Sequence, residues 1–376
     1  MPRLPGLDQV SSPSFSRRTA LRALAGGAIA ASAVAAAPRP RALARTSATR
    51  TRQERINFGA KAVYMDPRKS DATVVRSLLD LIDRTELNAL VIDIKEEGVY
   101  FESGVKLFRA NGAIATKYDI ADLIGTMRDR GVYTIARLVT FKDPILAERR
   151  PDLAVGDIGG GVWRDITGSA WLNPFNEEVW DATASLAAEA AGYGFDEIQL
   201  DYVRFPTDGN LSRMVFGRPL SQIARQDAIL GVVELTLDRL VPSGAALGAD
   251  IFGWSLVVDD DNGIGQNAAQ LAPVLDFFCP MVYPSHWPQG SLNVSGHPND
   301  FPYRTVEISM ELANAKLPTL TKKVRPWLQG FSLPGFTPYF SGDIRAQIDA
   351  AEANGIEGWM IWDFDNAYPE DAFRRA

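Results

Sequence analysis

The chain has 376 residues, of which 46% are hydrophobic and 23% are charged, and its formal net charge is −7. This composition is typical of a soluble globular protein with a large core, and it argues against a chain disordered over most of its length. The length suits one large α/β barrel or two smaller domains.

The first 55 residues differ in composition from the rest of the chain. Arg17 and Arg18 precede an apolar run rich in Ala and Gly over residues 23–37, which is the pattern of a twin-arginine export signal. The run is short for a membrane span, so an uncleaved anchor is the weaker alternative. Pro38 disfavours cleavage directly before it, which makes Ala44 the better cleavage position.

We therefore expect an export signal and leader over residues 1–55 and a single domain over residues 56–376. The domain would be periplasmic or extracellular, with attachment to the envelope left open and no stable membrane span after cleavage. Without the leader, 29 basic residues stand against 44 acidic ones, a net charge of about −15. Nucleic acid is accordingly a poor first guess for a partner. Cys279 is the one cysteine, so we expect a small core residue and no internal disulfide.

Apolar runs of strand length alternate with amphipathic stretches in the rest of the chain. In chain order, strands are expected at residues 60–65, 89–94, 133–139, 197–203, 246–252, 277–283, 325–328 and 358–362. Helices are expected between them at residues 72–84, 120–130, 177–191, 221–240, 303–315 and 343–354. Eight such repeats, without a glycine-rich phosphate loop after the first strand, predict an α/β fold, a (β/α)8 TIM barrel in one domain.

Polar and aromatic residues gather at the C-terminal ends of these predicted strands. In a TIM barrel this end carries the binding residues, whereas the packed interior favours branched apolar side chains. The sequence therefore predicts a site at the C-terminal face, built from Asp93, Lys95, Arg137, Asp201, Arg204, Asp250, Trp254, Tyr283, His286, Gln329, Trp362 and Asp363.

Asp201 ends the fourth predicted strand and is the central candidate. Alternation along this strand places Gln199 and Asp201 on one face and Ile198 and Leu200 on the other. A charge on the inner face of a buried strand is costly unless it is paired or used. The alternative to a catalytic role is a structural ion pair between Asp201 and Arg204.

Asp201 and Asp250 end neighbouring predicted strands and could act as a carboxylate pair. A glycosidase needs two carboxyl groups about 5–5.5 Å apart for retention or about 6.5–9.5 Å apart for inversion. We expect Asp201 to be the nucleophile or transition-state stabiliser, kept ionised by Arg137 and by Arg204 if that side chain folds back. Asp250 is the expected general acid, because apolar neighbours would raise its pKa. Asp93 competes for that role.

The other rim residues are expected to bind substrate. Lys95 shares a face with Asp93 by alternation, which favours Asp93 as an ionised supporting carboxylate. Trp254, Trp287 and Trp362 suit stacking on sugar rings, whereas we expect Trp359 to pack in the core. Arg137, Arg204, Tyr283, His286, Gln329 and Asp363 complete the expected binding set.

The sequence offers little support for metal or cofactor chemistry, and we expect neither. Two histidines and one cysteine do not provide the usual ligands of a zinc site. The acidic run at residues 259–263 could hold calcium, although a solvated turn is the more usual structure for such a run. A Gly-x-Ser-x-Gly nucleophile elbow is absent from the sequence.

Six blocks together resemble a bacterial glycoside hydrolase family of TIM-barrel proteins catalogued as a domain of unknown function. The resemblance runs over residues 58–368, and its blocks lie at residues 88–95, 135–143, 195–206, 249–253, 279–286 and 325–329. It implies a (β/α)8 barrel and hydrolysis of glycosidic bonds. The chain is also distantly similar to the α-amylase superfamily, in which the nucleophilic aspartate ends strand four and the acid ends strand five. Asp201 and Asp250 hold those places, but an aspartate at strand five has a short side chain for the acid.

The leading hypothesis is an exported glycoside hydrolase that acts on a neutral or cationic poly- or oligosaccharide. The competing hypothesis is a non-catalytic barrel that binds carbohydrate or acts as an envelope scaffold. A hydrolase or lyase of another ester or amide is the third.

Overall fold

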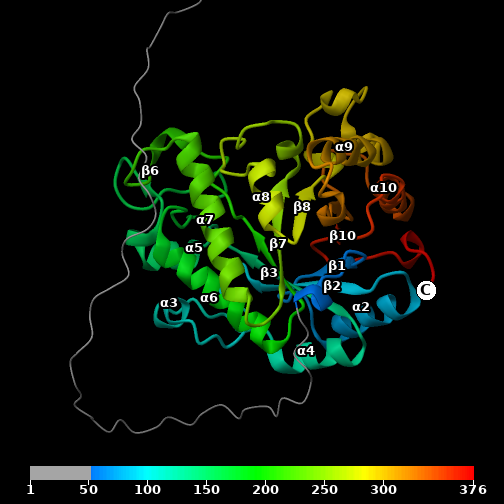
Figure 1. Ribbon diagram of the computed structural model, residues 1–376, viewed down its shortest axis with the longest axis horizontal. Helices are drawn as coiled ribbons and strands as arrows, with labels where there is room; N and C mark the ends of the chain where they lie inside the picture. Colours follow the sequence, from blue (N-terminus) through cyan, green and yellow to red (C-terminus); the bar gives the residue numbers. More distant parts are fainter. Residues whose placement is uncertain (1–51) are drawn as a thin grey trace, which may run out of the picture. The chain divides into compact units, whose positions relative to one another are not determined.

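The computed structural model describes residues 52–376, so the predicted export signal lies outside the described residues. Eight parallel strands form a closed barrel in the order β1-β10-β9-β8-β7-β5-β3-β2 (Figure 1). The strands are β1 Lys61–Met65, β2 Ala89–Lys95, β3 Tyr133–Val139, β5 Glu197–Asp201, β7 Ala246–Phe252, β8 Phe277–Met281, β9 Trp327–Gln329 and β10 Trp359–Trp362. The predicted TIM barrel is confirmed, with β5 fourth and β7 fifth along the chain.

Helices surround the barrel and connect its strands (Figure 1). The larger ones are α2 Ala72–Arg84, α4 Ile120–Asp129, α6 Glu177–Tyr193, α7 Gln222–Leu240, α9 Pro302–Lys316 and α10 Ser341–Ala353, close to their predicted bounds. Side-chain caps explain several starts, because Asp71 accepts from the amides of Thr73 and Val74, and Asp119 caps α4 in the same way. The sequence did not predict the short helices α3 Lys106–Ala110, α5 Pro144–Arg149 and α8 Ala268–Val274.

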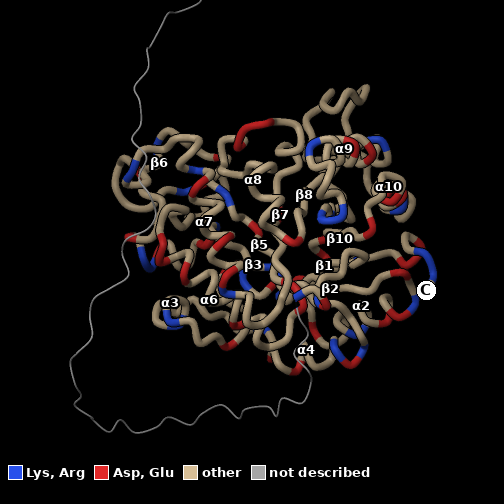
Figure 2. Tube along the Cα trace, viewed as in Figure 1, with Lys and Arg blue, Asp and Glu red and all other residues tan. Residues whose placement is uncertain are grey.

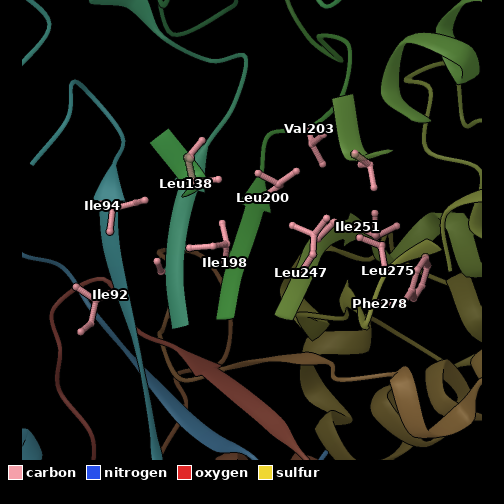
Figure 3. Packing of buried hydrophobic residues seen from close by; sticks show 14 of the residues in the cluster. Ile92, Ile94, Leu138, Ile198, Leu200, Val203, Leu247, Ile251, Leu275 and Phe278 are labelled. Atoms are coloured by element: carbon pink, nitrogen blue, oxygen red, sulfur yellow. The ribbon is translucent and has the colours of Figure 1, made fainter. Parts of the chain in front are cut away.

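The strands bury an apolar outer face against the helices. Figure 3 shows this face, with Ile198 and Leu200 of β5 beside Leu138 of β3 and Leu247 of β7. Gln199 and Asp201 alternate with Ile198 and Leu200, so they face the barrel interior, as the strand pattern predicted. A second cluster fills that interior and includes Ala62, Tyr64, Val91, Ile135, Cys279, Trp327 and Met360. Cys279 is fully buried, as expected.

Two strands end earlier than the sequence suggested. The fourth strand ends at Asp201 rather than at residue 203, and the sixth ends at Met281 rather than at residue 283. At the first of these ends Tyr202 has a φ of 47°, in the left-handed region, and cannot continue a strand. Two short strands, β4 Gly156–Asp157 in the loop after β3 and β6 Met214–Val215 in the loop after β5, pair antiparallel outside the barrel.

The chain before the first strand contacts the N-terminal end of the barrel. Helix α1 Arg52–Arg55 falls inside the predicted leader. Arg52 forms an ion pair with Asp276, and Arg55 donates to the backbone carbonyl of Phe195. Asp276 and Phe195 lie one and two residues before β8 and β5, so α1 lies at the face opposite the predicted site.

Charged residues of both signs lie on the helices and loops, and others lie near the central strands (Figure 2). None of the helices within residues 52–376 is both long and apolar enough to span a membrane.

Candidate active site

A cavity of about 370 Å³ opens at the C-terminal ends of the barrel strands. Its size falls in the range of small-molecule sites. Seven of the residues predicted for the site line it, namely Arg137, Asp201, Arg204, Trp254, Tyr283, His286 and Trp362, together with Tyr202, Phe252, Gly253, Met281, Trp287 and Phe331. Asp201 is the single carboxylate among these lining residues.

Arg137 joins two carboxylates at the floor of this cavity. Its Nε and Nη2 donate to Oδ2 of Asp201, at 2.9 and 2.5 Å, and its Nη1 donates to Oδ1 of Asp93, at 2.7 Å. All three side chains are nearly inaccessible to solvent. The negative charges of Asp93 and Asp201 raise the pKa of Arg137 against the effect of burial, so this residue is a permanent cation. The network holds Asp201 in one orientation.

The other oxygen of Asp201 is held by the backbone. The amide of Tyr202 donates to Oδ1 of Asp201 at 2.6 Å. A bulky residue at a φ of 47° is strained, and such strain is found where function requires a particular geometry. The turn at Tyr202 therefore helps to fix the carboxylate at the end of β5.

Asp93 lies below the cavity with both oxygens engaged. Oδ1 accepts from Arg137, and Oδ2 accepts from the hydroxyl of Tyr64 at 2.6 Å. Burial raises the pKa of Asp93 to about 6, although Arg137 and the Tyr64 hydrogen bond act in the opposite direction. Asp93 is thus ionised at neutral pH and supports Arg137.

Aromatic rings cover the guanidinium of Arg137. Trp362 lies with its ring centroid 4.7 Å from Cζ of Arg137, and Tyr64 stacks on Trp362 at 3.8 Å. Such cation–π contacts stabilise a desolvated guanidinium and limit its movement.

Asp250 lies on β7, next to Asp201 on β5. Leu200 and Ala249 are paired in the strand register, so Asp201 and Asp250 follow at the same level. Oδ1 of Asp250 accepts from Nε1 of Trp327 at 2.6 Å. Burial raises the pKa of Asp250 well above its ordinary value, and the negative charge of Asp201 raises it further. Asp250 is therefore a carboxylic acid that keeps its proton to higher pH than an exposed aspartate.

One oxygen of Asp250 remains available. Oδ2 has no hydrogen-bond partner among the described residues. It is also not fully enclosed by protein atoms. Asp250 is buried and does not line the cavity, although its strand neighbour Asp201 does. Because Oδ1 accepts the Trp327 hydrogen bond, Oδ2 is the oxygen that is free to carry the proton when Asp250 is protonated.

Arg204 does not pair with Asp201, so the structural ion pair considered from the sequence is absent from residues 52–376. Its Nη1 donates to the carbonyl of Phe205 and to the hydroxyl of Thr207, at 3.0 and 3.3 Å. The left-handed turn at Tyr202 redirects the chain after β5, and Arg204 lines another part of the cavity wall.

Lys95 lies away from the cavity, contrary to its predicted place. The pairing of β2 with β3 shifts between Asp93 and Lys95, which is a bulge. The extra residue reverses the alternation, so Lys95 points to the outer layer, where it pairs with Asp143 at 2.9 Å and donates to the carbonyl of Val139. Lys95 is a buried structural residue here.

Two further predicted residues hold loops and do not line the cavity. Gln329 is fully buried and bonds to the backbone of Ser285 and Phe331. Asp363 accepts from the amides of Asp365 and Ala367, and its pKa is raised by burial. Both lie at strand ends, as predicted, but they act on the neighbouring backbone.

The tryptophans divide between the cavity and the core. Trp254 and Trp287 lie 5.7 Å apart between ring centroids in the cavity wall, and Trp254 is 37% exposed. Trp359 is fully buried in the outer core, as expected. The sequence did not single out Trp327, whose apolar strand gave no sign that its Nε1 would reach Asp250.

The acidic run at residues 259–263 is used within the protein. Asp261 pairs with Arg225 and accepts from the amides of Gly263 and Gly265. Within residues 52–376, no three His, Cys, Asp or Glu side chains are grouped so that they could hold a metal ion.

Comparison with known proteins identifies the family. The family model described as "Putative glycosyl hydrolase domain" matches residues 62–368. The chain belongs to this glycosyl hydrolase family. The match spans all eight barrel strands except the first residue of β1. None of the curated proteins matches the chain.

Three solved structures are similar to the chain, and the first two share its architecture. The glycoside hydrolase domain of PgaB from Bordetella bronchiseptica is 12% identical with a TM-score of 0.60, covering 82% of this chain and 94% of that one. The spore cortex-lytic enzyme SleL of Bacillus megaterium is 11% identical with a TM-score of 0.51, covering 84% and 72%. A hypothetical protein from Ruminiclostridium thermocellum is 35% identical over 50% of this chain and 96% of its own, with a TM-score of 0.45.

Proposed function

We propose that this glycosyl hydrolase domain cleaves glycosidic bonds of a poly- or oligosaccharide with Asp201 and Asp250. One observation supports this most strongly: two carboxyl groups lie at the same level on neighbouring strands, Asp201 at the end of β5 and Asp250 two residues before the end of β7, in opposite electrostatic environments. Asp201 is paired with Arg137, whereas burial favours the protonated form of Asp250. Pairs of carboxyl groups with such different environments are typical of acid and nucleophile in glycosidases.

In this proposal Asp201 faces the sugar from the cavity floor. Its charge would stabilise the oxocarbenium-like transition state or attack the anomeric carbon. Oδ2 of Asp250 would give its proton to the leaving oxygen, directly or through a water molecule. Asp93 is less suited to the acid role, because both of its oxygens are already bonded. Trp254 and Trp362 would stack on sugar rings in the cavity.

The proposal is tested by incubating the protein with bacterial envelope and exopolysaccharide glycans and measuring new reducing ends. Asp201→Asn and Asp250→Asn should each lower the rate by about 10²- to 10⁴-fold. Asp365→Asn is the matched control, because this aspartate is exposed at the same rim and pairs with Lys69. Full activity of both site variants would contradict the proposal. Glycan binding without product release by the wild type would favour a non-catalytic carbohydrate-binding barrel.

We also propose that the protein is exported by the twin-arginine route. The support is the sequence alone, in which Arg17 and Arg18 precede the apolar run at residues 23–37. Replacing both arginines by lysine should retain the protein in the cytoplasm. Unchanged export of this double variant would contradict the route.

A further inference from the structure

Arg204 is a buried cation without a carboxylate partner in the described part of the chain. The residue is 6% exposed and lines the cavity. The other arginines buried in the barrel are neutralised: Arg137 pairs with two aspartates, and Arg325 pairs with Glu197 at 2.7 Å. Removing a charge from water is costly, and it is normally offset by an opposite charge. Carboxylates lie in the neighbourhood of Arg204, but none within residues 52–376 forms an ion pair with it.

The free donors of Arg204 form a pair. Nη1 is occupied by the carbonyl of Phe205 and the hydroxyl of Thr207. Nε and Nη2 have no acceptor within residues 52–376, and neither is among the atoms enclosed completely by protein. Nε and Nη2 lie on one edge of the guanidinium, which is an edge that holds a carboxylate through two parallel hydrogen bonds. This edge is therefore open to an acceptor that enters the cavity.

Aromatic rings hold the guanidinium in place. Its Cζ lies 4.5 Å from the ring centroid of Phe252, 4.9 Å from that of Trp171 and 5.1 Å from that of Tyr202. Cation–π contacts offset part of the desolvation, but they supply no acceptor for N–H groups. Burial lowers the pKa of Arg204, which is the expected result for a cation that lacks sufficient compensation.

We infer that Arg204 binds the carboxylate of an acidic sugar residue in the substrate. The inference rests on the proposed function, because it takes the cavity as the sugar site. A planar monoanion fits the open edge. A dianion such as a phosphate ester would bring a second charge near Asp201, Asp208 and Asp165, where, within residues 52–376, Arg204 is the one lining arginine without a carboxylate partner. The acidic net charge of the chain suggested a neutral or cationic glycan, but the local charge at the cavity decides recognition.

The test compares glycans that differ only in the carboxylate. Binding is measured by calorimetry for oligogalacturonate and for hyaluronan oligosaccharides. Each is compared with its neutral, carboxyl-reduced counterpart and with an O-sulfated form of that counterpart. The wild type should bind at least one carboxylate form about 10- to 100-fold more tightly than its reduced form, as expected for one charge-assisted pair. Arg204→Met should lose this preference, and Arg204→Lys should keep part of it.

Arg218→Met is the matched control for the loss of an arginine–aromatic contact. Arg218 lies over Phe175 at 4.8 Å, is exposed and does not line the cavity, so its variant should keep the preference. If Arg204→Met does not fold, Arg204→Lys and Arg204→Gln provide the comparison. Equal binding of the paired glycans, a preference that survives in all Arg204 variants, or tighter binding of the sulfated forms would overturn the inference.

Reducing-end release measured on the same glycans separates this inference from the proposed function. Carboxylate-dependent binding without cleavage would support the role of Arg204 and contradict the hydrolase. Cleavage of neutral glycans that does not depend on Arg204 would support the hydrolase and contradict the carboxylate site.

Discussion

Arg137 donates two hydrogen bonds to a single oxygen of Asp201, through Nε at 2.9 Å and Nη2 at 2.5 Å. The same guanidinium reaches Asp93 through Nη1, so one buried cation fixes two carboxylates that come from different strands. This arrangement links the stability of the barrel rim to the orientation of the proposed catalytic carboxylate.

Replacing Arg137 should therefore lower both stability and activity. Arg137→Met leaves two buried aspartates without their cation, and breaking a buried ion pair in this way costs about 3–5 kcal/mol. We expect the free energy of unfolding, measured by urea denaturation, to fall by that amount. Arg218→Met serves as the control, because its guanidinium is exposed and should change the unfolding free energy little. Equal losses in the two variants would contradict the role of Arg137.

Tyr64→Phe should shift the acidic side of the pH–activity profile upward. Asp93 has a pKa of about 6, and its protonation below that pH weakens the pair with Arg137. The Tyr64 hydroxyl donates to the ionised form and so lowers this pKa. Its removal should raise the pKa by about one unit, and the acid limb of kcat/KM should follow.

Tyr133→Phe is the control for this measurement. Tyr133 donates to Glu197, a buried carboxylate at the opposite end of the barrel. The acid limb of the kcat/KM profile of Tyr133→Phe should coincide with that of the wild type. A limb that stays in place in Tyr64→Phe, or moves equally in both variants, would show that Asp93 does not control the profile.

Asp250→Asn should gain stability relative to the wild type as the pH rises. The pKa of Asp250 is raised in the folded protein, whereas an unfolded aspartate titrates at about pH 4. Between these two pKa values the folded state holds the proton and the unfolded state has lost it. Wild-type stability therefore falls with pH in this window, by up to about 1.4 kcal/mol per unit. Asparagine cannot ionise and can still accept from Trp327. Parallel stability curves of the two proteins from pH 4 to 8 would refute the raised pKa.

Lys95→Met should destabilise the protein without changing substrate affinity. Lys95 neutralises Asp143 in the outer layer, where both side chains are fully buried, so the variant leaves a buried charge unpaired. Urea denaturation should show a loss of about 3–5 kcal/mol, while KM of the folded enzyme stays at the wild-type value. A large rise in KM with unchanged stability would contradict this structural role and indicate that Lys95 binds substrate.

The sequence predicted the barrel well because each of the eight strands is a mostly apolar run. A closed parallel sheet covered by helices buries its strands and therefore requires such runs. The sequence predicted less where the backbone departs from regular geometry. The bulge after Asp93 turned Lys95 outward, and the positive φ of Tyr202 separated Arg204 from Asp201. Neither feature has a local sequence signal, because glycine is absent from both positions and the surrounding fold sets the conformation.

The site was predictable as a gathering of residues but not as a network. The sequence placed Asp201, Asp250 and Arg137 near strand ends. Arg137 and Asp201 line the cavity, and Asp250 lies level with Asp201 on the neighbouring strand. The sequence could not show that Arg137 bridges Asp93 and Asp201, or that Trp327 holds one oxygen of Asp250. Such contacts depend on distances across the barrel, between residues far apart along the chain.

The assignment of Asp201 and Asp250 is tested most directly by varying the leaving group of the substrate. The dinitrophenolate of a dinitrophenyl glycoside leaves without being protonated. The leaving oxygen of the natural glycan must be protonated by the general acid. We predict that Asp250→Asn keeps near-wild-type kcat/KM on the dinitrophenyl glycoside but loses about 10²- to 10⁴-fold on the glycan, while Asp201→Asn loses activity on both. An Asp250→Asn variant impaired equally on both substrates, or an Asp201→Asn variant active on either, would contradict the account.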